Sequence, residues 1–123
     1  MDVVVSDHPA IGAVTVALHG QLDLDAAPRL QAAFDGLHER SVNRVVVDLA
    51  ELRFCDSIGL SALVVAHNYC TAAGGYLRLA APSEFMVRVL SVVGITGALP
   101  VYRTVPAALA GDPAERILGA PEP

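Results

Sequence analysis

The residues with the clearest chemical potential are Asp56 and Ser57, which follow an apolar segment and precede an apolar helical pattern. A helix that begins at Ser57 places free backbone N–H groups and the positive end of its dipole beside that serine. A phosphate on the hydroxyl would be stabilised there, and it would add about −1.5 to −2 charges to the surface. The pair therefore indicates either a phosphorylation site or an ordinary helix N-cap, because both residue types are common caps.

The helix that follows, about residues 57–73, has two distinct faces when its residues are spaced at 100°. One face is apolar and is expected in the core: Leu60, Leu63, Ala66 and Cys70. Another face is small and mostly uncharged: Ser57, Ser61, Val64, Asn68 and Thr71. This second face suits either a flat contact with another protein or an ordinary solvated surface.

Strand and helix patterns alternate along the chain, and together they must position this serine. Strands are expected at residues 3–5, 13–20, 44–49, 76–80 and 98–102, where apolar residues alternate or form short β-branched runs. Helices are expected at residues 23–39, 57–73, 83–93 and 105–110, where apolar residues follow helical spacing. Residues 51–56 are expected to form the loop that leads to Ser57.

This order predicts an α/β fold with one mixed β-sheet of about four or five strands packed against about four helices. The opening hairpin, with a turn at residues 8–12, makes the sheet mixed rather than fully parallel. The domain is expected to span residues 1–111. Residues 112–123 are expected to form a flexible C-terminal tail, because prolines and glycines are frequent there.

The composition excludes several other classes of protein. Hydrophobic residues make up 54% of the 123 residues, which is enough for a core without disulfides or metals. The net charge is −5 and the basic residues are scattered arginines, so we expect no direct nucleic-acid binding. No signal-peptide pattern or apolar run of about 20 residues is visible, which predicts a cytoplasmic protein without membrane insertion.

The remaining reactive side chains give no pattern for catalysis or metal binding. Cys55 and Cys70 lack the spacing of a zinc site and are expected as buried free thiols, and Asp56 opposes activation of the Cys55 thiol. Ser57 lacks the Gly-x-Ser-x-Gly pattern of a nucleophile elbow. We therefore predict no catalytic residues, no metal and no cofactor, and a chain that is not an enzyme.

Several segments resemble the STAS family, and specifically its bacterial anti-sigma-factor antagonists. Residues 54–60, Phe-Cys-Asp-Ser-Ile-Gly-Leu, are similar to the hydrophobic–x–Asp-Ser-x-Gly-Leu signature of that family. Residues 20–23, Gly-Gln-Leu-Asp, resemble its Gly-Glu-Leu-Asp turn. Residues 45–49 with Leu52 and Phe54, the glycine pair at 74–75 and the Val-Val-Gly-Ile turn at 92–95 extend the resemblance over about residues 3–110.

The resemblance implies a STAS-like domain that binds an anti-sigma factor and so releases a sigma factor for transcription. That anti-sigma factor is often a serine kinase, which implies that phosphorylation of Ser57 switches the antagonist off and that a PP2C-type phosphatase restores it. The residues expected at the partner surface are Asp23, Asp56, Ser57, Ile58, Gly59, Ser61, Val64 and Asn68. A monomer is expected.

Two departures from the family pattern bear on this function. Gln21 replaces the usual acidic residue, which removes a charge contact, and Ile58 stands beside Ser57 where Ser or Thr is common. Ile58 could therefore alter kinase access or the choice of partner. The alternative is a STAS scaffold that works without phosphorylation, or an accessory module for ligand sensing or lipid transport. A ligand cavity, additional domains or loss of the phosphoacceptor would favour that alternative.

Overall fold

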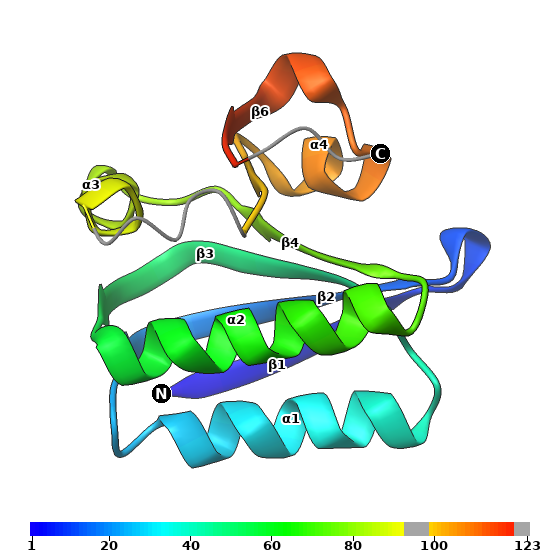
Figure 1. The fold of residues 1–123 in the computed structure, drawn as a ribbon, viewed down its shortest axis with the longest axis horizontal. Helices are drawn as coiled ribbons and strands as arrows, with labels where there is room; N and C mark the ends of the chain where they lie inside the picture. The colour runs from blue at the N-terminus through cyan, green and yellow to red at the C-terminus, as the bar shows by residue number, and fades with distance from the viewer. Residues whose placement is uncertain (93–98, 120–123) are drawn as a thin grey trace.

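The computed structural model describes residues 1–92 and 99–119 and contains a six-stranded sheet whose strand order follows the chain (Figure 1). Its strands are β1 (Asp2–His8), β2 (Ala13–Leu22), β3 (Arg44–Cys55), β4 (Tyr76–Ala80), β5 (Val101–Tyr102) and β6 (Arg116–Leu118). Strands β2 to β5 pair in parallel, whereas β1 and β6 pair antiparallel with β2 and β5. The predicted mixed α/β sheet is confirmed, with one strand more than expected.

Four helices cover this sheet: α1 (Ala27–Glu39), α2 (Ser57–Ala72), α3 (Glu84–Val92) and α4 (Val105–Ala110). Two 3₁₀ turns, η1 (Pro9–Ile11) and η2 (Pro113–Glu115), complete the described elements. Helices α1, α2 and α3 share one core with β3 residues Val45 and Val47, while α4 packs on a smaller cluster around Val46. Neighbouring strand residues face opposite sides, so α4 covers the other face of the sheet.

Strand β3 is buried on both faces, as its β-branched run predicts, but it is longer than expected. Residues 51–55, predicted as a loop, continue the strand because the end of β2 offers them a partner. The register passes through one irregularity before Gly20 pairs with Leu52, and through a second before Leu22 pairs with Cys55. A non-local pairing of this kind leaves no local signal in the sequence.

The predicted helix boundaries hold closely, except at the start of α1. This helix begins at Ala27 rather than at Asp23, whose Oδ1 instead accepts a hydrogen bond from the Ala26 N–H at 3.0 Å. Helix α2 ends one residue early, and α4 matches the prediction. The predicted end of the third helix at 93, most of the predicted turn at 92–95 and the predicted strand start at 98 lie outside the described residues. The strand predicted at 98–102 is shorter than expected, because residues 99 and 100 lie outside β5.

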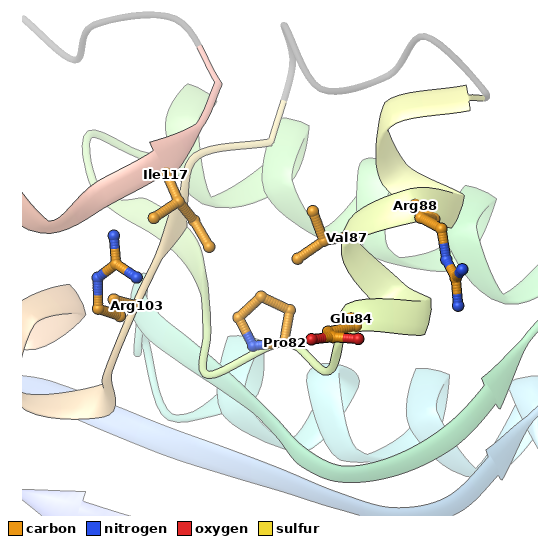
Figure 2. Close-up of a pocket in the computed structure, with 6 residues that line it drawn as sticks. All are labelled: Pro82, Glu84, Val87, Arg88, Arg103 and Ile117. Atoms are coloured by element: carbon orange, nitrogen blue, oxygen red, sulfur yellow. The ribbon is translucent and has the colours of Figure 1, made fainter.

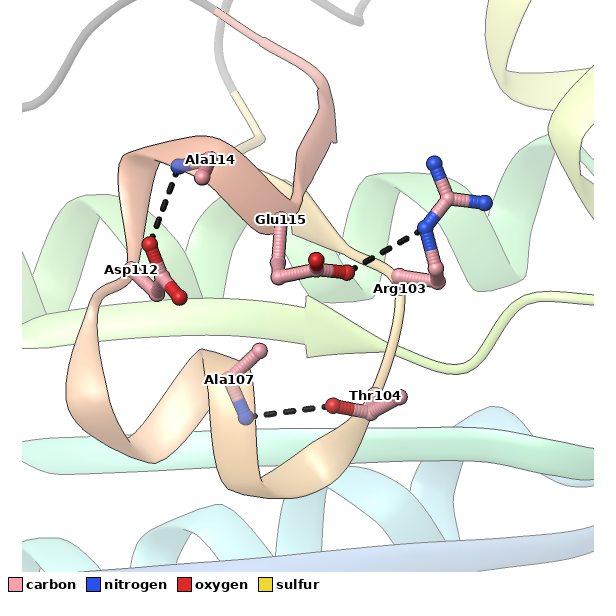
Figure 3. A network of polar contacts seen from close by, with 6 residues as sticks. All are labelled: Arg103, Thr104, Ala107, Asp112, Ala114 and Glu115. Atoms are coloured by element: carbon pink, nitrogen blue, oxygen red, sulfur yellow. Dashed lines mark hydrogen bonds and ion pairs between the residues drawn. The ribbon is translucent and has the colours of Figure 1, made fainter.

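The C-terminal segment corrects the prediction of a flexible tail from residue 112. Strand β6 pairs with β5, and Arg103 Nε contacts Glu115 Oε2 at 3.2 Å (Figure 3). Thr104 caps α4 through the Ala107 N–H at 3.2 Å, and Asp112 Oδ1 accepts from the Ala114 N–H at 3.0 Å. Residues 112–119 therefore pack as part of the domain, and residues 120–123 are not described.

The close contact between Gly75, just before β4, and the Asn43 carbonyl can be tested by its effect on stability. A Cβ on Gly75 would overlap the Asn43 carbonyl oxygen, which also accepts the Tyr76 N–H at 2.8 Å. We expect Gly75→Ala to lower the free energy of unfolding by at least about 2 kcal/mol, because backbone must move. Gly36→Ala is the matched control: it lies within α1 with open space around it and should add about 0.5–1 kcal/mol. Urea denaturation of both variants measures the difference, and equal effects would contradict this account.

Candidate functional site

Helix α2 begins at Ser57, but the residue that caps it is Asp56. The Asp56 backbone is extended, with φ −94° and ψ −178°, and its Oδ1 accepts the Gly59 N–H at 2.9 Å. Ser57 is exposed, and its hydroxyl has no hydrogen-bond partner among the described residues. The sequence allowed the pair to be a helix N-cap or a phosphorylation site. In the structure Asp56 is the N-cap, and the Ser57 hydroxyl stays available for chemistry.

The position of this serine is set by close contact between α2 and the end of β2. The Asp56 N–H donates to the Leu22 carbonyl at 3.2 Å, and Leu22 pairs with Cys55 in the sheet. A Cβ on Gly59 would lie 2.6 Å from both Leu22 Cγ and the Leu22 carbonyl oxygen. The first turn of the helix can approach the strand this closely because residue 59 is glycine.

Large apolar side chains are exposed around the serine. Phe54 lies three residues before Ser57 and Ile58 directly follows it. Each exposes about two fifths of its surface, 41% and 44%. The Phe54 ring stacks on Phe85 of α3, with centroids 6.5 Å apart, and Leu24, two residues beyond Leu22, is 64% exposed. We call these four residues the apolar rim: Leu24, Phe54, Ile58 and Phe85. Exposed apolar side chains of this size are common at protein-binding surfaces.

The other predicted surface residues differ in burial and in their hydrogen bonds. Gly59 is buried, and half-buried Asp23 accepts the Ala26 N–H in the turn before α1. Ser61 is exposed and donates its hydroxyl hydrogen to the Ser57 carbonyl at 2.9 Å. Val64 is half-buried and Asn68 is exposed, and their place on a partner surface stays a prediction. The predicted core face of α2 is confirmed as buried: Leu60, Leu63, Ala66 and Cys70.

Sequence reasoning missed most of the exposed apolar residues. It did not single out Leu24, Phe85, Val65 or Tyr69, although the last two are 59% and 49% exposed on α2. One signal was present in the sequence: α2 contains no aspartate, glutamate, lysine or arginine over its 16 residues. A surface helix without charge is unusual in water, and it favours an outer face that meets another molecule.

Both cysteines are buried free thiols, as predicted. Burial, with a smaller contribution from the neighbouring Asp56 carboxylate, raises the pKa of the Cys55 thiol to about 12. Burial alone raises the pKa of Cys70 to about 11. Neither thiol is activated, since thiolate is the reactive form.

His8, His38 and His67 lie away from Ser57. His8 shares a hydrogen bond of 2.8 Å with Thr15, and the His38 ring stacks on Tyr69 with centroids 3.5 Å apart. His67 lies ten residues further along α2, about 15 Å at 1.5 Å per residue. Over residues 1–92 and 99–119, no three His, Cys, Asp or Glu side chains gather as metal ligands would.

A hollow of about 440 Å³ lies between α3 and the segments that follow β4 and β5. Pro82, Val87 and Ile117 surround its centre, and the guanidinium groups of Arg88 and Arg103 lie on opposite sides of it (Figure 2). Helix α3 leaves β4 toward the main core, whereas α4 leaves β5 toward the other face. Ligands in open α/β sheets often bind at such a switch point.

None of the described helices has the length and hydrophobicity to cross a membrane.

The role assigned to Asp56 gives a direct test. We expect Asp56→Ala to lower the free energy of unfolding by about 1 kcal/mol, because the Gly59 N–H loses its acceptor. Asp56→Asn keeps a side-chain oxygen at the same place and should cost no more than about half of that. Thermal or urea unfolding of the two variants measures the effect. Equal losses would show that the cap does not act through this hydrogen bond.

The cysteines give a test in alkaline solution. At pH 8 a pKa near 12 leaves about a thousandfold less thiolate than the ordinary value of 9.0, so folded Cys55 should resist iodoacetamide. The folded pKa lies above the unfolded one. The contribution of this thiol to stability is therefore complete below pH 9 and is lost as pH rises from about 9 to about 12. Rapid alkylation of the folded protein, followed by mass spectrometry, would contradict the burial.

Comparisons with known proteins agree with this architecture. The family model described as "Mlab, STAS domain" matches residues 10–103. A Thermotoga neapolitana protein named as an anti-sigma factor antagonist homologue is 28% identical over 76 residues, covering 62% of this chain and 67% of that protein. The anti-sigma F factor antagonist of Paenibacillus polymyxa is 25% identical over 92 residues, covering 74% and 79% of the two chains.

Solved structures share the fold as well. The crystal structure of an anti-sigma factor antagonist from Mycobacterium paratuberculosis has a TM-score of 0.79 and 26% identity, covering 89% of this chain and 92% of that one. A sulfate transporter family protein from Wolinella succinogenes has a TM-score of 0.71 and 23% identity, covering 81% and 84%. The fold thus occurs in proteins of different names. Because the family model matches most of its length, this chain belongs to the STAS-domain family.

Proposed function

We propose that this chain is an anti-sigma-factor antagonist whose binding surface surrounds Ser57. It binds an anti-sigma factor of the serine kinase type, and the bound anti-sigma factor releases its sigma factor. Phosphorylation of Ser57 ends this binding, and a PP2C-type phosphatase restores it. The observation that carries the proposal is the Ser57 hydroxyl, which is exposed, outside the capping hydrogen bond and bordered by the apolar rim. The names of the relatives described above support the same role.

The geometry suits Ser57 as a phosphoacceptor. Asp56 caps the helix, so a kinase does not have to break a capping hydrogen bond to reach the Ser57 hydroxyl. The N–H groups of Ser57 and Ile58 belong to the first turn, where no carbonyl of the helix can reach them. A phosphate held there gains from these groups and from the helix dipole, so the fold can carry it.

The same geometry explains how a phosphate would end binding. A partner that covers the apolar rim removes water from Ser57 as well, because the rim borders the serine. The phosphate adds about −1.5 to −2 charges beside the Asp56 carboxylate, and burying that charge costs several kcal/mol unless the partner supplies cations. An uncharged hydroxyl carries a much smaller cost. One modification therefore changes the affinity without changing the fold.

A second candidate function is ligand sensing by a STAS accessory module that needs no phosphate. The specific observation in its favour is the hollow of about 440 Å³ at the switch point beside α3. None of the apolar-rim residues is among the described residues that line it. If the chain is a ligand sensor, substitutions at Ser57 should leave the protein's interactions unchanged.

Substitution of Ser57 tests the proposed switch. We expect Ser57→Asp to keep the fold and to weaken binding to the anti-sigma factor at least tenfold, because a carboxylate must then be buried beside Asp56. Ser57→Ala should bind within about threefold of the wild type and accept no phosphate. Affinities come from calorimetric titration against the anti-sigma kinases of the same genome, and phosphate from peptide mass spectrometry after incubation with ATP.

Ser61→Ala is the matched control for the kinase assay, since its exposed hydroxyl lies one turn further along α2. It should still be phosphorylated, with the phosphate mapped to Ser57. A phosphate on another residue, or full binding by Ser57→Asp, would reject the switch. If the wild-type chain binds none of these kinases, the ligand-sensing function becomes the better account.

A further inference from the structure

Helix α2 carries an exposed apolar stripe that continues away from Ser57. Ile58, Val65 and Tyr69 lie at positions i, i+7 and i+11, which share one face of a helix. Their exposed fractions are 44%, 59% and 49%. No charged residue interrupts this face, because α2 contains none. The stripe extends about 16 Å at 1.5 Å per residue, which is about three helical turns.

Helix α1 borders this stripe with polar residues. Figure 1 shows α1 and α2 side by side on the sheet, and the His38 ring stacks on Tyr69 with centroids 3.5 Å apart. Gln31, Asp35 and His38 lie at i, i+4 and i+7, so they share the face of α1 that meets α2. Gln31 Nε2 donates to Asp35 Oδ1 at 2.9 Å. We call these residues the α1–α2 seam: Gln31, Asp35, His38, Ile58, Val65 and Tyr69.

The charges of α1 are divided between its two sides. Arg29 donates to the Met1 carbonyl and Arg40 contacts Asp7 Oδ1 at 3.1 Å, so both arginines are directed toward β1. Asp35, in contrast, is exposed beside α2. The seam is therefore an apolar strip with an acidic border, and a surface complementary to it would be apolar with a basic border.

We propose that the α1–α2 seam is a second docking strip for the anti-sigma factor, and that it receives an amphipathic helix of that partner. The apolar stripe of the helix covers Val65 and Tyr69, and a lysine or arginine beside that stripe pairs with Asp35. The inference rests on the proposed function, because it assigns the same partner. Ile58 belongs to both the apolar rim and the seam, so the two surfaces are continuous.

Three single substitutions in the complete, unphosphorylated chain test this surface. Val65→Glu places a charge in the stripe and should weaken binding to the anti-sigma factor at least tenfold. Asp35→Lys should weaken binding most at low salt, since it turns an attraction into a repulsion. Ala32→Glu adds the same charge as Val65→Glu on an exposed part of α1 outside the seam, and it should bind within about twofold of the wild type. Circular dichroism checks that each variant is folded.

The outcomes separate this inference from the proposed function. If Ser57→Asp loses affinity while Val65→Glu binds like Ala32→Glu, the seam is not a docking strip and the switch stands. If the wild-type chain binds no anti-sigma factor, both proposals fall. If the chain alone is a dimer on gel filtration and Val65→Glu makes it a monomer, the occupant is a second copy of this chain, which overturns the assignment to the partner.

Discussion

The contact between the first turn of α2 and the carboxyl end of β2 determines the rest of the site. The Leu22 carbonyl accepts the Asp56 N–H, and the absence of a side chain on Gly59 lets the helix approach that carbonyl. Strand β3 is extended to Cys55 by pairing with the same part of β2. Ser57 is therefore held by two strands and a helix at once, and its hydroxyl has a defined position at the surface.

Because of that contact, Asp56 caps the helix and Ser57 keeps an exposed hydroxyl. A serine that caps a helix holds its hydroxyl oxygen against the backbone, because one lone pair of that oxygen accepts an N–H. Here the aspartate accepts the hydrogen bond and the serine begins the helix. A modification of Ser57 would thus change surface charge and leave the capping oxygen in place, which fits a switch that acts on binding rather than on folding.

Charged side chains are scarce on the surface that extends from Ser57 along α2. Helix α2 has no charged residue, and Arg29 of α1 and Arg40 just after it are directed toward β1. The molecule carries a net charge of −5, yet the surface that runs from Phe54 to Tyr69 is largely apolar. Exposed apolar surface is unfavourable in water, which agrees with the contact with another protein proposed above.

The sequence by itself determined the elements whose signal is local. Helical spacing defined α2 and α4, a β-branched run located the start of β3, and Asp56-Ser57 marked the site. Only the tertiary structure decided the extension of β3, the strand β6, and the exposure of Phe85 and Val65. Each depends on residues far apart in the chain, such as Phe54 and Phe85 or His38 and Tyr69. Periodicity shows that a residue lies on one face of an element, but whether that face is covered depends on which element packs against it.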